Sequence, residues 1–205
     1  MHLEIFNKDQ QVLLSWLARF SRKYYLVGGT AIALHLGHRR SLDFDLFTKD
    51  TISKSRLKNQ LSQIPYDHQP LFEDIDQLHM MINRVKITFF HYPFDIEAPN
   101  KLPNNLKFPD LLTLAAMKSF ALGRRAKWKD YVDLYFIIKY HHSIEEISKK
   151  ANEIFGDQYA EKLFRQQLAF HKDIDYTESV EYLVDAPKDE EIKTFLVDRS
   201  VSFLK

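Results

Sequence analysis

Apolar residues recur at helical spacing near the start of the chain, and the pattern then shortens to strand-like runs. The spacing over residues 9–21 predicts an amphipathic helix. A short β-prone run at 24–27 follows, and residues 30–37 form a helical pattern that Gly37 ends. Residues 42–47 alternate apolar and acidic side chains, which is typical of a strand with two unlike faces.

The second half of the chain is patterned mainly for helices. Between the halves, we expect a polar helix at 53–64, a hairpin of strands at 77–83 and 85–91, and an irregular connection with prolines between 93 and 109. Helices are then predicted at 111–125, 127–142, 144–155, 157–170 and 189–203. The predicted fold class is α+β. An α/β core with a short mixed sheet (residues 1–100) precedes a mostly helical domain (residues 101–205).

Composition narrows the class of protein. The chain has 205 residues, 45% of them hydrophobic, which fits one domain or two small lobes with a real core. The absence of cysteine excludes a disulfide scaffold and suits a reducing compartment. A net charge of +1 gives no global attraction to nucleic acid or membrane. No apolar run approaches the roughly 20 residues that span a bilayer. We therefore expect a cytoplasmic protein with no membrane partner.

The stretch GGTAIALHLGHRRSLDFDLF contains the main candidate binding residues. Gly28 and Gly29 stand between a strand and a helix, where backbone without Cβ can approach a phosphate. Asp43 and Asp45 are two apart, so on a strand they point to one face. Two neighbouring carboxylates repel each other, and Mg²⁺ relieves that repulsion while completing its coordination with phosphate and water. The order of these features indicates a site for Mg²⁺ and a nucleoside triphosphate.

Each feature also has a plainer interpretation. A Gly-Gly pair is often only a turn, and an acid–apolar–acid strand is often an exposed sheet edge. Other chemistries find less support. The nine histidines show no zinc-ligand spacing, and the sequence has neither a G-x-x-x-x-G-K-[ST] loop nor a G-x-S-x-G turn.

The same stretch resembles the first motif of nucleotidyltransferases with a DNA polymerase β-like core, and more narrowly the AbiEii-type toxin nucleotidyltransferases. The family pattern is GGT-A-L followed by R-x-S-x-D-x-D-L-F. A second block of the family has a helical Lys, one or more Arg, and then R/K-D-x-x-D-L. The residues of this chain that match the second block are Lys118, Arg124, Arg125, Lys129, Asp130, Asp133 and Leu134.

The resemblance, which covers about residues 20–140, implies roles for individual positions. Asp43 and Asp45 would bind the metal. Gly28, Gly29 and the following hydroxyl of Thr30 would hold the triphosphate. Ser41 and Arg125 are also expected to bind the nucleotide.

Lys118 would contact the nucleotide, and Asp130 would act near the acceptor hydroxyl or orient Lys118. If their helix runs unbroken past Gly123, Lys118 and Arg125 share a face. In the plainer alternative, Lys118 extends to solvent. Asp130 and Asp133 would then pair with Arg124, Arg125 or Lys129 at the surface.

One position departs from the superfamily pattern. A third carboxylate is expected on a neighbouring strand, and in the candidate strand at 85–90 that place is taken by Thr88. A hydroxyl is a weak metal ligand and no carboxylate base. Asp95 or Glu97, just beyond the strand, could substitute for it. The departure leaves the two-metal mechanism and the general base open, with Asp130 as the preferred base.

Three functions remain open at this point. The first is an Mg²⁺-dependent enzyme that moves a nucleotide from an NTP to the 3′ end of a tRNA or to a protein hydroxyl, as the toxin of a toxin–antitoxin pair. Its RNA groove would be lined by Arg39, Arg40, Arg124, Arg125, Lys127 and Lys129. The second is a weak or inactive relative that binds nucleotide or a partner protein. The third is an interaction protein whose acidic strand is an exposed edge. The sequence specifies neither the NTP, the acceptor, the antitoxin nor the oligomeric state.

Overall fold

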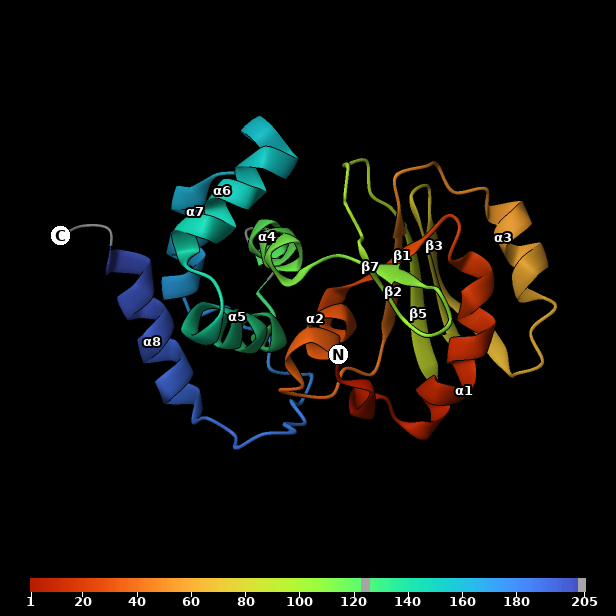
Figure 1. The fold of residues 1–205 in the computed structure, drawn as a ribbon, viewed down its shortest axis with the longest axis horizontal. Coiled ribbons are helices and arrows are strands. Elements are labelled where there is room, and N and C mark those ends of the chain that lie inside the picture. The colour runs from red at the N-terminus through yellow and green to blue at the C-terminus, as the bar shows by residue number, and fades with distance from the viewer. Residues whose placement is uncertain (123–125, 203–205) are drawn as a thin grey trace.

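The computed structural model describes residues 1–122 and 126–202, and these form a sheet half and a helical half (Figure 1). Within the described residues the strands make one seven-stranded mixed sheet in the order β3-β4-β5-β2-β1-β7-β6. The strands are β1 (Tyr25–Val27), β2 (Phe44–Thr48), β3 (His68–Asp74), β4 (Gln77–Ile82), β5 (Val85–His91), β6 (Asn100–Lys101) and β7 (Lys107–Phe108).

Helices flank the sheet and fill the second half of the chain. They are α1 (Lys8–Leu17), α2 (Gly28–Leu36), α3 (Lys54–Leu61), α4 (Leu111–Leu122), α5 (Trp128–Tyr140), α6 (Ile144–Phe155), α7 (Glu161–Ala169) and α8 (Asp189–Val201). Short 3-10 turns lie at Leu3–Ile5, Ala18–Phe20 and Gly156–Gln158. In Figure 1, α1 and α3 lie on one side of the sheet, and α2 and the C-terminal helices lie on the other.

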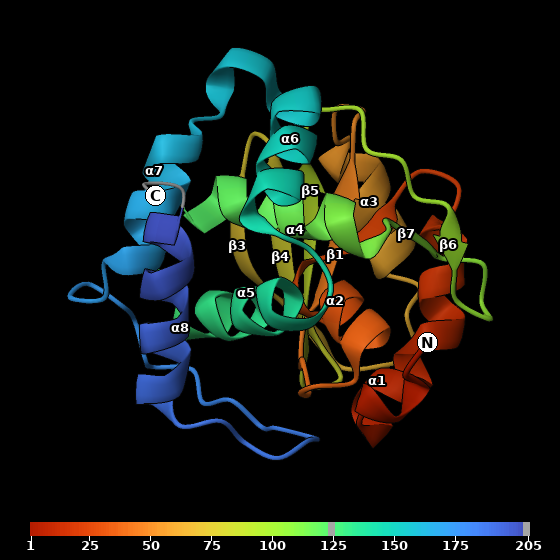
Figure 2. The same ribbon diagram turned by 60° about the vertical axis from the view of Figure 1, so that its left-hand side comes forward.

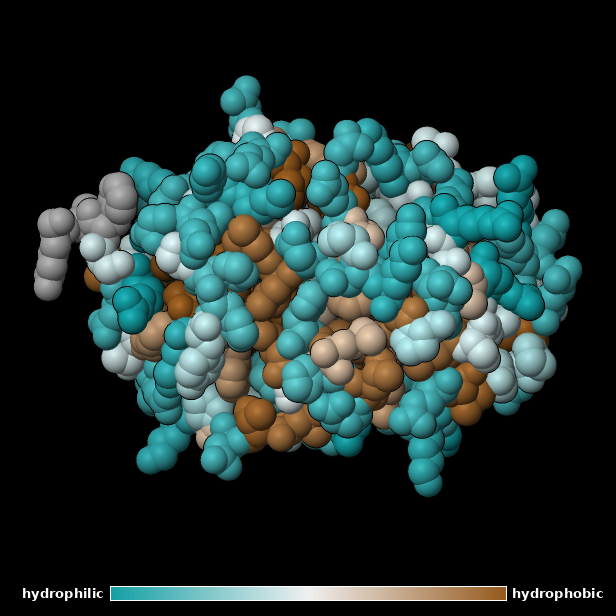
Figure 3. Space-filling model, viewed as in Figure 1, coloured by the Kyte–Doolittle hydropathy of each residue, from teal (hydrophilic) through white to brown (hydrophobic). Residues whose placement is uncertain are grey.

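The C-terminal helices pack closely on one another. Figure 2 shows α6 lying across α4, and α7 beside α8. Figure 3 shows a mostly hydrophilic face, with hydrophobic residues gathered near its middle, where the two halves of the chain meet. None of the helices in the described ranges combines enough length and apolarity to span a bilayer.

Side chains along β2 alternate between the two faces of the sheet. Phe44 and Leu46 are fully buried, and the ring of Phe44 packs against Phe6, which precedes α1. Asp45 lies between these two residues, so it points to the opposite side, toward α2 and the helical half. The carboxylate is thereby kept out of the apolar core.

Two local signals fix the helix ends beside this strand. Gly37 has a φ of +64° and ends α2 in the left-handed conformation that glycine adopts without strain. Asn7 and Gln10 form a reciprocal capping box that starts α1. The sequence predicted the end at Gly37, but it placed the first helix at 9–21, whereas α1 starts at Lys8 and ends at Leu17.

The predicted α+β class is confirmed, and most predicted elements are present. The predicted strand at 42–47 is shifted, since β2 starts at Phe44 and Asp43 lies one residue before it. The helix predicted at 157–170 starts only at Glu161. Strand β3 was missed because all seven of its residues are exposed, so its sequence shows no apolar alternation.

The connection predicted as irregular contributes two short strands to the sheet. β7 pairs in parallel with β1, and β6 pairs with β7. The sheet therefore takes in residues up to Phe108. The division of the chain into domains at residue 100 stays a prediction.

Candidate active site

The Gly-Gly turn lies directly against the acidic strand. Gly28 begins α2 with a φ of +71°, and a Cβ added there would lie 2.2 Å from Oδ2 of Asp45. A Cβ on Gly29 would lie 2.5 Å from Nη2 of Arg39 and 3.0 Å from Oγ of Ser41. The space left by the two missing side chains is thus used by the protein's own groups. This close approach explains why two of the five glycines stand side by side.

The loop between α2 and β2 is tied to its surroundings by buried polar contacts. Thr30, 1% exposed, donates its hydroxyl to the backbone carbonyl of Asp43. Gln10 donates from Nε2 to the carbonyl of Ser41 at 2.7 Å. These bonds hold the backbone on either side of Asp43, so its position does not depend on a ligand.

The carboxylates of Asp43 and Asp45 lie close enough for the charge of one to affect the other. Burial raises the pKa of Asp43, and the charge of Asp45 raises it further, against an opposing influence of Lys86. A raised carboxyl pKa means that the ionised form is disfavoured where it stands. A divalent cation would relieve this cost, and Mg²⁺ commonly takes one or two protein carboxylates. The donor set therefore fits such an ion.

Thr88, at which the sequence predicts that a third carboxylate is missing, lies beside Asp45 in the sheet. In the parallel ladder between β2 and β5, Asp45 pairs directly with Thr88. Asp95 does not substitute for it, because its side chain is 87% exposed and pairs with Lys49 at 2.5 Å. Within residues 1–122 and 126–202, no cluster of three or more metal-ligating side chains (His, Cys, Asp or Glu) is present. The departure seen in the sequence persists in the fold.

Lys118 lies inside a buried ion network between α4 and α5. Its Nζ is 2.6 Å from Oδ1 of Asp130 and 2.9 Å from Oδ2 of Asp133, and its side chain is 5% exposed. Burial lowers the pKa of Lys118, but the charges of Asp130 and Asp133 outweigh it and raise the value. Lys118 is therefore a fixed ammonium, and the alternative in which it extends to solvent is wrong.

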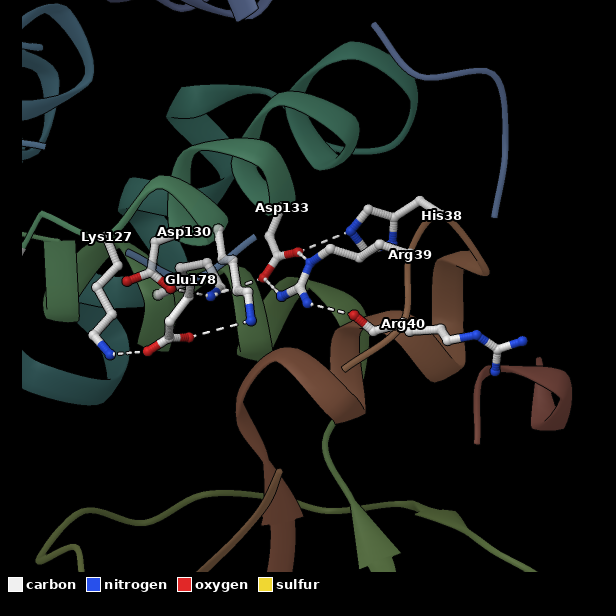
Figure 4. Close-up of polar contacts among 9 residues, drawn as sticks. His38, Arg39, Arg40, Lys127, Asp130, Asp133 and Glu178 are labelled. Carbon is white, nitrogen blue, oxygen red and sulfur yellow. Dashed lines mark hydrogen bonds and ion pairs between the residues drawn. The ribbon is translucent and has the colours of Figure 1, made fainter. Parts of the chain in front are cut away.

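Arg39 and His38 complete this network from the sheet half (Figure 4). Arg39 binds both oxygens of Asp133, with Nε to Oδ1 at 2.7 Å and Nη2 to Oδ2 at 2.9 Å. Nε2 of His38 lies 2.8 Å from Oδ1 of the same carboxylate. Burial raises the pKa of Asp133, but the charges of Arg39 and Lys118 together with these hydrogen bonds hold it well below its usual range.

One of the six basic residues predicted to line an RNA groove is buried, and two lie outside the described residues. Arg39 is 2% exposed and bound to Asp133, so it cannot line a groove. The surface pairing considered for Asp133 is also wrong, because its partners are Arg39, Lys118 and His38. Arg124 and Arg125 lie outside the described residues, and so does the prediction that Arg125 shares a face with Lys118.

One further acidic residue at the site was missed. Glu178, from the segment between α7 and α8, pairs with Lys127 at 2.5 Å and Lys129 at 3.2 Å. No local motif surrounds Glu178 in the sequence, so its role in the site could not be predicted from sequence patterns. Its place among the lysines is visible only in the fold (Figure 4).

The family follows from a direct comparison. The family model described as "Nucleotidyl transferase AbiEii toxin, Type IV TA system" matches residues 11–198. This chain belongs to the AbiEii family. The match includes both the Gly-Gly/DxD stretch and the Lys118–Asp133 network, and it extends through the helices beyond the resemblance seen in the sequence.

One curated relative is similar over part of its length. An uncharacterised protein of Aquifex aeolicus, aq_aa25, is 34% identical over 140 residues, or 62% of this chain. The chain spans 65% of that relative, just under two thirds of its length.

Two solved structures share the fold. The nucleotidyltransferase toxin MenT4 of Mycobacterium tuberculosis aligns with a TM-score of 0.64 at 15% identity, covering 95% of this chain and 81% of that one. JHP933 of Helicobacter pylori aligns with a TM-score of 0.57 at 17% identity, covering 94% and 88%. At these identities the likeness shows a shared fold and says nothing of a substrate.

Proposed function

We propose that this AbiEii-family chain is an Mg²⁺-dependent nucleotidyltransferase that moves a nucleoside monophosphate from an NTP to an acceptor hydroxyl. The main support for the proposal is that the Gly-Gly turn on the acidic strand is in contact with the buried network around Lys118. The Gly28-Gly29 turn packs on Asp45, and Arg39, which lies against Gly29, binds the Asp133 carboxylate that also holds Lys118. If the Arg39–Asp133 ion pair served stability only, the Gly28-Gly29 turn would not need to pack against Asp45.

The residues of the chain divide into three roles. Asp43 and Asp45 would hold Mg²⁺, which supplies charge neutralisation at the phosphates when bound. Gly28, Gly29, Thr30 and Ser41 shape the backbone where the triphosphate would lie, and Arg125 stays a predicted nucleotide contact. Lys118 stays a predicted nucleotide contact, and its ammonium is held by Asp130 and Asp133, which offset its positive charge.

Asp130 has a more specific part in this scheme. The sequence allowed it to serve as a base or to orient Lys118. Its 2.6 Å ion pair with a buried ammonium supports orientation, because one of its two carboxylate oxygens, Oδ1, accepts a hydrogen bond from Lys118. In the reaction the acceptor hydroxyl oxygen attacks the α-phosphorus and its proton passes to solvent water, while the bond from the α-phosphorus to the bridging oxygen breaks and that oxygen leaves with pyrophosphate. Positioning and charge neutralisation carry most of such a step.

We further propose that the chain acts as a toxin in the cytoplasm. The matched family belongs to a type IV toxin–antitoxin system, and MenT4, which shares the fold, is a nucleotidyltransferase toxin. The acceptor would be the 3′ end of a tRNA or a protein hydroxyl, and a cognate antitoxin protein would be the regulatory partner.

One observation favours a second candidate function. Thr88 stands beside Asp45 where a third carboxylate would complete the metal site. A chain with two carboxylates could bind nucleotide without turning it over and act as a sensor or partner-binding protein.

A transfer assay separates the two candidates. The purified protein is incubated with Mg²⁺, each α-labelled NTP in turn and total tRNA, beside an Asp43→Ala/Asp45→Ala control. Label that enters RNA or the protein itself, and disappears in the control, supports the transferase and identifies its nucleotide. Mg²⁺-dependent NTP binding without transfer supports the second candidate. Loss of both signals in the wild-type chain contradicts both candidates.

A further inference from the structure

A segment far along the sequence returns to the active site. Residues 170–188 connect α7 to α8, and we call them the strap. Near its start the strap pairs with the beginning of α5, where Asp175 donates its N–H to the carbonyl of Ala126 at 2.7 Å and its carbonyl accepts from the N–H of Trp128 at 3.0 Å. This part of the strap is fixed to the helical half.

A second anchor fixes the strap to the sheet half. The N–H of Arg40 donates to the carbonyl of Glu181 at 2.8 Å, and the N–H of Leu183 donates to the carbonyl of His38 at 3.0 Å. Glu178 lies between the two anchors. The side chain of Asp175 also accepts from the N–H of Thr177 at 2.8 Å, which shapes the turn just before Glu178. The strap therefore presents Glu178 at a defined place.

Glu178 is held by two ammonium groups. Its Oε1 lies 2.5 Å from Nζ of Lys127, and its Oε2 lies 3.2 Å from Nζ of Lys129. The hydrogen bond from Lys127 lowers the pKa of Glu178 most, and together the lysines bring it to about 2. Each of the two carboxylate oxygens of Glu178 therefore pairs with a different lysine.

This cluster lies in the field of the acidic strand. Burial and the charge of Asp45 raise the pKa of Asp43 most. The charge of Glu178 also raises this pKa, and the charge of Lys129 lowers it. Charges on the strap and at the start of α5 therefore influence the pKa of Asp43, a candidate metal ligand.

We propose, building on the proposed function, that Lys127 and Lys129 form a phosphate-binding site that Glu178 occupies in the ligand-free protein. A phosphate group offers two unbridged oxygens and a negative charge, as the Glu178 carboxylate does. A substrate phosphate must displace Glu178 to reach the lysines. The phosphate belongs either to the triphosphate of the NTP or to the backbone of an RNA acceptor.

Binding measurements on the full chain test this site. The probes are inorganic tripolyphosphate without Mg²⁺, a labelled NTP with Mg²⁺, and a short single-stranded RNA. The variant is Glu178→Gln, which keeps the shape of the side chain and removes its charge. The control is Glu181→Gln on the same strap, since Glu181 pairs with Arg40 at 2.7 Å instead of the lysines. Thermal unfolding checks that each variant is folded.

Glu178→Gln is expected to tighten binding of tripolyphosphate by about three- to tenfold, the range that follows from losing two partly exposed ion pairs as competitors. Glu181→Gln should leave the affinity unchanged. A matching gain with the NTP assigns the phosphate to the nucleotide, and a gain with RNA but not with the NTP assigns it to the acceptor. In a Lys127→Gln/Lys129→Gln background the effect of Glu178→Gln should vanish.

Equal affinity of the wild type and Glu178→Gln for all three probes overturns the proposal. So does a gain that persists without the two lysines or that Glu181→Gln reproduces. The tripolyphosphate arm needs neither Mg²⁺ nor turnover. Failure of nucleotide transfer therefore contradicts the proposed function without deciding the outcome at this site.

Discussion

Arg39 and Asp133 form a bidentate ion pair that links the sheet half of the protein to its helical half. Arg39 follows α2 in the loop that leads to the acidic strand, and Asp133 lies on α5. Both side chains are buried, at 2% and 0% exposure. Because Asp133 also contacts Lys118 at 2.9 Å, one carboxylate sets the position of the acidic loop relative to the catalytic lysine candidate.

Asp133→Asn is expected to destabilise the fold by about 3–5 kcal/mol, since it leaves buried cations without their partner. The pKa of Asp133 in the folded protein lies well below its usual value. Its contribution is therefore complete above about pH 4 and declines as the pH falls toward the folded pKa. Urea unfolding at pH 7 measures the loss. The control is Glu190→Gln, which breaks a pair whose acid is 82% exposed. Equal effects of the two substitutions would contradict the assigned role of Asp133.

Gly28→Ala is expected to displace Asp45, because the new Cβ would lie 2.2 Å from its Oδ2. The readout is the Mg²⁺-dependent shift in Tm, which this variant should lose. Gly156→Ala separates this clash from backbone strain, since Gly156 also has a positive φ (+52°) but nothing lies within 4 Å of its added Cβ. It should cost about 1–3 kcal/mol and keep the Mg²⁺ response. A normal Mg²⁺ response in Gly28→Ala would show that Asp45 is not a ligand.

Thr88→Asp places a third carboxylate beside Asp45 in the ladder. Without metal, repulsion between neighbouring like charges should lower the stability, by up to about 1 kcal/mol. With Mg²⁺ the Tm should rise more than it does in the wild type, because the ion then has three carboxylate ligands. Thr88→Asn is the uncharged control. An Mg²⁺ response no larger than that of Thr88→Asn would place the metal elsewhere.

Asp43→Asn is expected to stabilise the metal-free protein at pH 7. Burial and Asp45 raise the folded pKa of Asp43, so its ionised form opposes folding. Folded Asp43 binds its proton more tightly than unfolded Asp43 does, so its charge begins to cost stability as the pH rises through the unfolded pKa of about 4, and the cost is complete above the raised folded pKa. The advantage of the variant should therefore shrink as the pH falls through that value. Chemical unfolding from pH 4 to 8 in EDTA measures this trend, and an advantage independent of pH would mean that charge is not its cause.

Part of the site could be read from the chain alone. The Gly28-Gly29 pair and the aspartates at 43 and 45 are close in sequence, and turn and strand periodicity place them near one another. The missing carboxylate at Thr88 could also be predicted, and the pairing with Asp45 is observed. In contrast, β3 was missed because its seven residues are all exposed, which removes the alternation that reveals a strand.

From the amino-acid sequence we could predict most of the helices and strands, the α+β class and the chemical groups of the site, because caps, turns and periodicity act over a few residues. Only the tertiary structure decided which charges meet. Arg39 and Asp133 are 94 positions apart, and Lys127 and Glu178 are 51 apart. Such pairs depend on how helices pack across the whole molecule. A lysine in an apolar helix gives no local sign of whether it reaches solvent or, as Lys118 does, two buried carboxylates.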